Sequence, residues 1–167
     1  AKSLDISRRI VVVAAVCFVA VALVACDRPR FHALDGSAVD LGALDERWLL
    51  INYWALWCEP CRVEVPELNA IAERHSARLQ VVGINFDADP PAALADQAQA
   101  LGIRYPVWRE DPQAWLGYPP PKGLPATYLV SPDRSQVYPM IGLQTTESIE
   151  RRMRKVGLLG GEPSADD

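Results

Sequence analysis

From residue 48 onward, short continuous apolar runs alternate with longer segments that mix apolar and polar residues. Residues 48–54 and 79–85 are almost entirely apolar over the length of a strand, which is typical of central strands buried on both faces. Residues 105–108 predict a further short strand. Residues 126–130 and 136–141 predict a pair of strands, because a Ser-Pro-Asp-Arg-Ser turn sequence joins them.

Helical patterns fill the intervals between these strands. Gly102 ends the second predicted helix, Asp111 caps the third, and Pro66 lies inside the first, where it is expected to kink the helix. The four predicted helices cover residues 59–75, 90–101, 111–116 and 146–156. This order of elements predicts an α/β fold whose sheet is parallel in part and antiparallel at one edge.

The N-terminal pattern is different and resembles a bacterial lipoprotein signal. Basic residues precede an apolar run of 15 residues, 10–24, which is shorter than the roughly 20 that a membrane-spanning helix needs. The run ends in Leu23-Val24-Ala25-Cys26, which resembles a lipobox and implies lipidation of Cys26. An uncleaved signal anchor is the alternative. Either interpretation predicts a domain tethered to a membrane outside the cytoplasm, and Asp27 resembles a signal for retention in the inner membrane.

These patterns divide the chain into a signal peptide (1–25), a tether (26–33), one folded domain (34–156) and a flexible tail (157–167). The turn dipeptide Asp35-Gly36 predicts a small N-terminal β-hairpin packed beside the main sheet.

Composition narrows the possible functions. Half of the 167 residues are apolar, which is enough for one sizeable core, and the net charge of −4 argues against a nucleic-acid partner. The four cysteines are too few for a disulfide scaffold, and Cys17 lies inside the apolar run. His32 and His75 are distant in sequence from Cys58 and Cys61, so no metal-ligand set is recognisable.

The two cysteines other than Cys17 and Cys26 lie in the sequence Trp57-Cys58-Glu59-Pro60-Cys61, directly after the first predicted strand. One helical turn separates Cys58 from Cys61, so both thiols can lie on one face of the helix. A helix N-terminus at Cys58 would favour its thiolate, and Pro60 in the first turn costs no hydrogen bond. This spacing predicts thiol–disulfide exchange, in which one thiolate attacks a disulfide and the second resolves the mixed disulfide.

The stretch Ile51-Asn52-Tyr53-Trp54-Ala55-Leu56-Trp57-Cys58-Glu59-Pro60-Cys61, followed by Glu64 and Pro66, resembles the membrane-anchored TlpA-type thioredoxin-like proteins. Gly123-Leu124-Pro125-Ala126 resembles their cis-proline loop. The resemblance implies a thioredoxin fold with a mixed central sheet flanked by helices, a cis Pro125 facing the cysteines, and no cofactor besides the Cys58–Cys61 disulfide. It also implies that Trp57, Pro60 and Leu124 contact a client protein, although core packing is the alternative for Trp57.

Two further positions bear on proton transfer. Thioredoxins have a buried aspartate where this chain has Asn52, and in the TlpA-type group a helix glutamate resembles the substitute. Glu64 is that residue here. Three positions after Cys61, it could accept a proton from the Cys61 thiol. A solvent-facing glutamate is the alternative.

We therefore expect an extracytoplasmic thiol–disulfide oxidoreductase on the periplasmic side of a membrane that reduces protein disulfides and is re-reduced by an inner-membrane electron donor. A disulfide oxidase or isomerase would use the same residues, and a metal-binding chaperone or a thiol peroxidase are further alternatives. The Gly-Val-x-x-x-Pro-Glu loop of the apocytochrome c reductants is not evident, because Leu124-Pro125-Ala126 stands in its place. A general reductase is therefore favoured over cytochrome c biogenesis.

Overall fold

The computed structural model describes residues 30–160, which form a mixed five-stranded sheet with the strand order β3-β2-β1-β4-β5. Neighbouring strands are parallel from β1 through β2 to β3, and antiparallel from β1 through β4 to β5. The strands are β1 (Trp48–Trp54), β2 (Leu79–Asn85), β3 (Val107–Trp108), β4 (Ala126–Val130) and β5 (Val137–Ile141). The sheet predicted from the apolar runs, with an antiparallel edge, is confirmed.

The helices also lie where the periodicity places them. They are α2 (Glu59–Arg74), α3 (Pro91–Leu101), α4 (Gln113–Leu116) and α5 (Thr146–Lys155), preceded by a 3-10 turn, η1 (Gly42–Leu44). Gly102 ends α3 in the left-handed region, with φ of 73°. The helix α4 begins two residues later than predicted, and its N-cap residue is Pro112 rather than Asp111. The Asp111 carboxylate still accepts a hydrogen bond from the Gln113 N–H at the start of the helix, at 2.8 Å.

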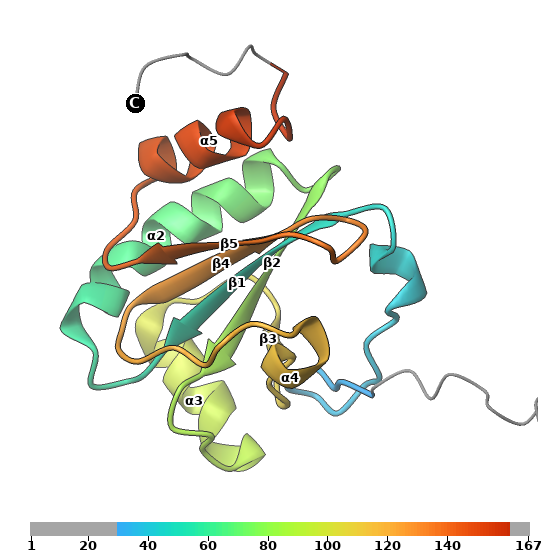
Figure 1. Ribbon diagram of the computed structural model, residues 1–167. Helices are drawn as coiled ribbons and strands as arrows, with labels where there is room; N and C mark the ends of the chain where they lie inside the picture. The colour runs from blue at the N-terminus through green and yellow to red at the C-terminus, as the bar shows by residue number, and fades with distance from the viewer. Residues whose placement is uncertain (1–29, 161–167) are drawn as a thin grey trace, which may run out of the picture.

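Strand β1 separates two apolar layers. Leu49, Ile51 and Tyr53 point to the layer covered by the N-terminal segment and α4, whereas Leu50 and Trp54 point to the opposite layer. The helices α2 and α5 cover this second face of the sheet (Figure 1), and α3 joins them through apolar contacts near Trp54. Because β1 is buried on both faces, the segment that follows it is held firmly where the chain leaves the sheet.

The predicted N-terminal hairpin is present only as a tight turn closed by one antiparallel bridge, between His32 and Ala38. Ala33 forms a second bridge to Trp108, so this segment pairs with the edge of β3 and does not build a separate two-stranded unit. Phe31 is buried and stacks on Trp108 at a ring-centroid distance of 5.1 Å. Leu158, also buried, belongs to the core layer under α5. Packed chain thus extends beyond both limits, 34 and 156, taken from the sequence.

The predicted signal peptide (1–25), the predicted lipidation site Cys26 and the end of the predicted tail lie outside the described residues. Within residues 30–160, no helix combines the length and the apolar character needed to cross a bilayer.

Candidate active site

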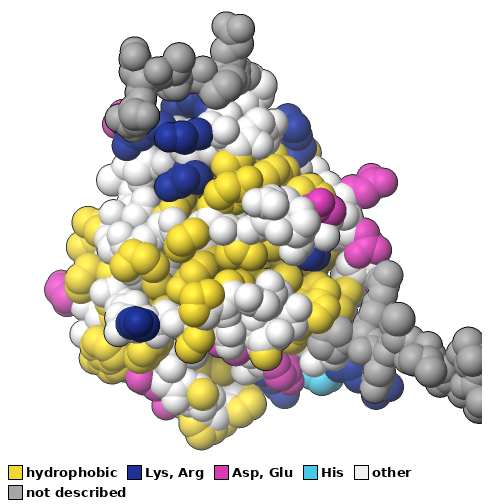
Figure 2. All heavy atoms as spheres, in the orientation of Figure 1, with side chains coloured by type: hydrophobic (Ala, Val, Ile, Leu, Met, Phe, Trp, Pro, Cys, Tyr) yellow, Lys and Arg dark blue, Asp and Glu magenta, His cyan; other side chains and the backbone are white. Residues whose placement is uncertain are grey.

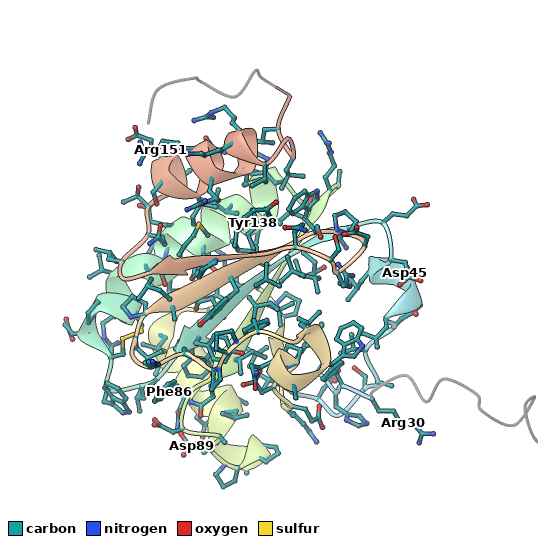
Figure 3. All side chains as sticks on the ribbon, in the orientation of Figure 1. Arg30, Asp45, Phe86, Asp89, Tyr138 and Arg151 are labelled. Atoms are coloured by element: carbon teal, nitrogen blue, oxygen red, sulfur yellow. A yellow bond between two sulfur atoms is a disulfide. The ribbon has the colours of Figure 1, made fainter. Side chains whose placement is uncertain are left out.

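The two motif cysteines form a disulfide at the junction between β1 and α2, with a Cα–Cα distance of 5.3 Å. Figure 3 shows this bond in yellow beside the start of α2. Cys58 is the N-cap residue of the helix, and its sulfur accepts the Cys61 N–H at 3.2 Å. Pro60 lies in the first turn, where its missing N–H leaves no partner unsatisfied. The predicted position of the pair at the helix N-terminus is therefore confirmed.

This geometry assigns different roles to the two sulfur atoms. The side chain of Cys58 lies at the positive end of the helix dipole, which favours its thiolate once the disulfide is reduced. Cys58 retains 3% exposure, whereas Cys61 has none. A disulfide from another protein therefore reaches Cys58 first, and Cys61 is placed to resolve the resulting bond.

The peptide bond between Leu124 and Pro125 is cis, as the resemblance implied. Leu124 packs against the apolar cluster that contains both cysteines. The carbonyl oxygen of Pro125 accepts a hydrogen bond from the Gly142 N–H at 2.9 Å, which fixes the loop to the end of β5. The loop before β4 therefore lies beside the start of α2, where its backbone can meet an incoming polypeptide.

Glu64 is fully buried, so the solvent-facing alternative is wrong. One carboxylate oxygen accepts a hydrogen bond from the Asn52 amide, and the other accepts one from the Gln144 N–H, each at 2.8 Å. Burial raises the pKa of the Glu64 carboxyl from 4.5 to about 7, while the two hydrogen bonds act in the opposite direction. A carboxyl with this pKa, one turn along the helix from Cys61, can take up or release a proton near neutral pH.

A chain of buried polar groups orients this carboxyl. The Tyr105 hydroxyl donates to the Asn52 side-chain oxygen at 3.1 Å, which turns the amide nitrogen toward Glu64. That nitrogen also contacts the Thr127 hydroxyl at 3.1 Å. Burial, and then the nearby Glu64 carboxyl, raise the pKa of Tyr105 well above 10, so its hydroxyl remains a donor. Asn52 cannot itself exchange protons, and its contribution is to position Glu64.

Gly83 on β2 provides the space for this arrangement. A Cβ atom at Gly83 would lie 2.9 Å from Trp54 Nε1 and 3.1 Å from the Tyr105 ring. The first distance is shorter than a Cβ atom can approach, and the second would require the Tyr105 ring to shift by a few tenths of an ångström, although both rings are buried. The glycine in the second strand is therefore required by the packing of Tyr105 and Trp54.

Trp57 lies on the surface with 65% of its area exposed, so the core-packing alternative for it is wrong. Its indole N–H donates to the Asp87 carboxylate at 2.8 Å. Its ring and the Phe86 ring are arranged edge to face, with their centroids 6.5 Å apart. Leu56, also exposed, extends this apolar surface. The loop after β2 thus holds an exposed tryptophan beside the reactive cysteine, in a position to contact a docked protein.

Both histidines contact glutamate side chains away from the cysteines. His32 meets Glu110 at 2.8 Å, and His75 meets Glu150 at 3.0 Å. Over residues 30–160, no group of three or more His, Cys, Asp or Glu side chains is arranged to hold a metal ion.

Sequence reasoning missed two groups that act on Glu64. Tyr105 was assigned only to a strand, and the Gln144 N–H gives no signal because it is a backbone group. A buried tyrosine hydroxyl needs a hydrogen-bond partner, so a Tyr in a predicted buried strand was the available signal for the first.

The fold, the disulfide at the N-terminus of α2 and the cis-proline loop define a thioredoxin-like thiol–disulfide oxidoreductase. The model of the AhpC/TSA family matches residues 24–135, and the chain belongs to that family. Two similar proteins are the thiol-disulfide oxidoreductases ResA of Bacillus thuringiensis and Bacillus subtilis. Each is 26% identical to this chain; the aligned regions cover 74% and 78% of this chain and 71% and 74% of those proteins.

Solved structures show the same fold. A DsbF homologue from Corynebacterium diphtheriae superposes with a TM-score of 0.64 at 24% identity, over 76% of this chain and 83% of that one. A thiol:disulfide interchange protein from Chlorobium tepidum gives a TM-score of 0.61 at 21% identity, over 78% and 93%.

Proposed function

We propose that this protein is an extracytoplasmic reductase of protein disulfides, in the TlpA-like branch of thioredoxin-like proteins. The buried carboxyl of Glu64, on the motif helix one turn after Cys61, is the observation that carries the direction of electron flow. A disulfide protein becomes a strong oxidant when its reduced, thiolate form is stabilised. A buried negative charge near the cysteines opposes thiolate formation, which favours the disulfide form and makes the dithiol a better reductant.

The reaction balances in two steps. The Cys58 thiolate attacks one sulfur of a client disulfide, so that a mixed disulfide forms and one client thiolate leaves. Cys61 then loses its proton to Glu64 and attacks the Cys58 sulfur, which releases the second client thiolate and closes the Cys58–Cys61 disulfide. Two electrons pass from the protein to the client. A dithiol donor must return two electrons, and the proton held by Glu64 then goes back to Cys61.

The cis-proline loop and the exposed tryptophan hold the client during this exchange. Leu124 offers its backbone to an extended client segment, while Trp57 and Pro60 contact the client next to Cys58. The lipobox at Cys26, outside the described residues, supports a lipid anchor on the periplasmic side, with an inner-membrane protein as electron donor. Incorporation of labelled palmitate that is lost in Cys26→Ser tests the anchor.

A trapping experiment tests the function. In Cys61→Ser, no second thiol can break the mixed disulfide between Cys58 and a client. Clients should therefore accumulate as mixed disulfides that mass spectrometry identifies. Cys58→Ser is the matched control and should trap none. The wild type should reduce insulin disulfides and should not rescue scrambled ribonuclease. Efficient ribonuclease rescue without insulin reduction would assign the protein to the isomerases.

A further inference from the structure

A large open pocket lies beside the cis-proline loop and has no part in the chemistry described so far. Its volume is about 730 Å³, within the range of about 300–1,000 Å³ typical of ligand sites. The buried residues Leu116, Tyr118 and Tyr128 form its floor. One wall is the face of β5 that carries Val137, Pro139 and Ile141, and the other wall is the loop that precedes β4. Hydrophobic side chains gather over these two elements in Figure 2.

The pocket is continuous with the candidate active site at both walls. Lys122 and Gly123 line one wall and directly precede the cis-proline loop at Leu124. Ile141, 65% exposed, lines the other wall, and the next residue, Gly142, is hydrogen-bonded to the loop. An extended segment advances about 3.3 Å per residue. A client segment paired with Leu124 would therefore bring side chains a few residues from its cysteine over the pocket.

The edge of β5 favours side-chain capture over the addition of a strand. The pairing of Tyr128 with Pro139 lies in the middle of the β4–β5 ladder. At the two ends of this ladder, the Ser131 N–H donates to the Gln136 carbonyl and the Gly142 N–H donates to the Pro125 carbonyl. Hydrogen-bonded and non-hydrogen-bonded pairs alternate along an antiparallel ladder, so the backbone of Pro139 points away from β4, to the outer edge of the sheet. Proline has no N–H, and it removes the central donor that a new strand would need. The client would instead fill the pocket with side chains.

Charge specifies the occupant further. The residues that line the pocket include two cations, Lys122 and Arg134, and no carboxylate. Arg134 is held by the carbonyl oxygens of Leu44 and Arg47. Lys122 is exposed, and its ammonium group has no ion pair within the described residues. An apolar floor with a free cation at the rim suits a large apolar side chain that is followed by a carboxylate.

From these contacts we infer that this pocket selects clients: it binds an apolar side chain and an adjacent Asp or Glu close in sequence to the client cysteine. The inference rests on the proposed function, because the cis-proline loop must first hold the client segment. The chemistry at Cys58 is then the same for every disulfide, and the pocket determines which polypeptides are reduced fastest.

Peptide disulfides test the inference. Two symmetric disulfide dimers carry Leu-Asp or Leu-Lys on both sides of a single cysteine, and oxidised glutathione serves as a substrate too small to reach the pocket. Ile141→Ser should lower kcat/KM for the Leu-Asp peptide by about tenfold. Lys122→Glu should reverse the preference between the two peptides. Both variants should reduce glutathione at the wild-type rate.

Two matched controls lie outside the pocket. Leu143→Ser removes a similarly exposed apolar side chain two residues further on, and Lys155→Glu makes the same charge change on α5. Both should stay within about twofold of wild type. Equal losses in the controls, equal losses with glutathione, or no loss with Ile141→Ser would each overturn the inference. So would a wild-type dimer in solution that Ile141→Ser dissociates, because the pocket would then bind a second copy.

A final measurement separates the pocket from the reductase proposal. A Leu-Asp peptide with Ser in place of Cys undergoes no exchange, so calorimetry reports its binding alone. Wild type should bind it more tightly than Ile141→Ser by about tenfold. If the wild type reduces none of the disulfides but binds this peptide, the proposed function fails and the pocket stands. Equal binding by both proteins refutes the pocket.

Discussion

Replacement of Glu64 by Gln should change how the stability of the protein depends on pH. Folding buries this carboxyl and raises its pKa from 4.5 to about 7. The folded state therefore binds the proton more tightly than the unfolded state does. The stabilisation that this proton provides is complete below about pH 4.5 and is lost as the pH rises through about 7. At about 1.4 kcal/mol per pKa unit, the loss amounts to about 3 kcal/mol.

The measurement is the free energy of unfolding in urea for the oxidised wild type and Glu64→Gln between pH 4.5 and pH 8.5. Gln cannot titrate, so it carries only a fixed cost from its mismatch with the donors of Asn52 and Gln144. The difference between the two proteins should shift by about 3 kcal/mol in favour of Gln as the pH rises. A constant offset at every pH leaves this shift unaffected.

Glu67→Gln is the matched control on the same helix. Its carboxylate accepts hydrogen bonds from the Thr146 hydroxyl and N–H, which lower the pKa of Glu67 below 4.5. Its difference from wild type should therefore be flat above about pH 5. The reasoning is refuted if Glu64→Gln gives a curve as flat as that of Glu67→Gln, because Glu64 would then be ionised throughout the range.

Three further substitutions test the surroundings of the site. Tyr105→Phe should cost about 1–3 kcal/mol of unfolding free energy, because it leaves the buried oxygen of Asn52 without its donor. It should also raise the midpoint of the Glu64-linked pH transition, because the Asn52 side-chain amide can then turn its oxygen toward Glu64, and this oxygen accepts a hydrogen bond only from the protonated carboxyl. Gly83→Ala should destabilise by about 1–3 kcal/mol in the same urea assay, because its Cβ would press on Trp54. Trp57→Ala should change stability by less than about 1 kcal/mol but lower kcat/KM for insulin by about tenfold.

Each of these substitutions has a control at a position without the contact in question. Tyr138→Phe removes a hydroxyl for which no hydrogen bond is found in the described part of the chain, and Gly123→Ala adds a methyl group in open space. Val63→Ala trims an exposed apolar residue that makes no comparable contact. Effects as large in these controls would contradict the roles assigned to Tyr105, Gly83 and Trp57.

Local signals were sufficient for much of the fold. The apolar runs 48–54 and 79–85 coincide with β1 and β2, because strands buried on both faces need continuous apolar sequence. Gly102 marked the end of α3 for an equally local reason, its left-handed backbone. The cis bond at Pro125 came from the resemblance alone.

What the sequence could not predict depends on contacts between distant residues. Three positions after Cys61, Glu64 was compatible with a buried or an exposed face of the helix, and only the packing of α2 on Asn52 decides between them. The donor from Tyr105 is 53 residues away from Asn52. In place of the expected N-terminal strands there are single bridges, since a two-stranded hairpin is marginally stable by itself and Phe31 stacks on Trp108 of the main sheet.

The reduction potential of the Cys58–Cys61 pair, measured by equilibration of the purified protein with glutathione or dithiothreitol buffers at pH 7, tests the central claim most directly. A reductase with a buried carboxyl beside its dithiol should have a potential near that of thioredoxin, about −270 mV. A value above about −150 mV, close to the periplasmic oxidant at about −120 mV, would contradict the assignment of Glu64 and the direction of electron flow together.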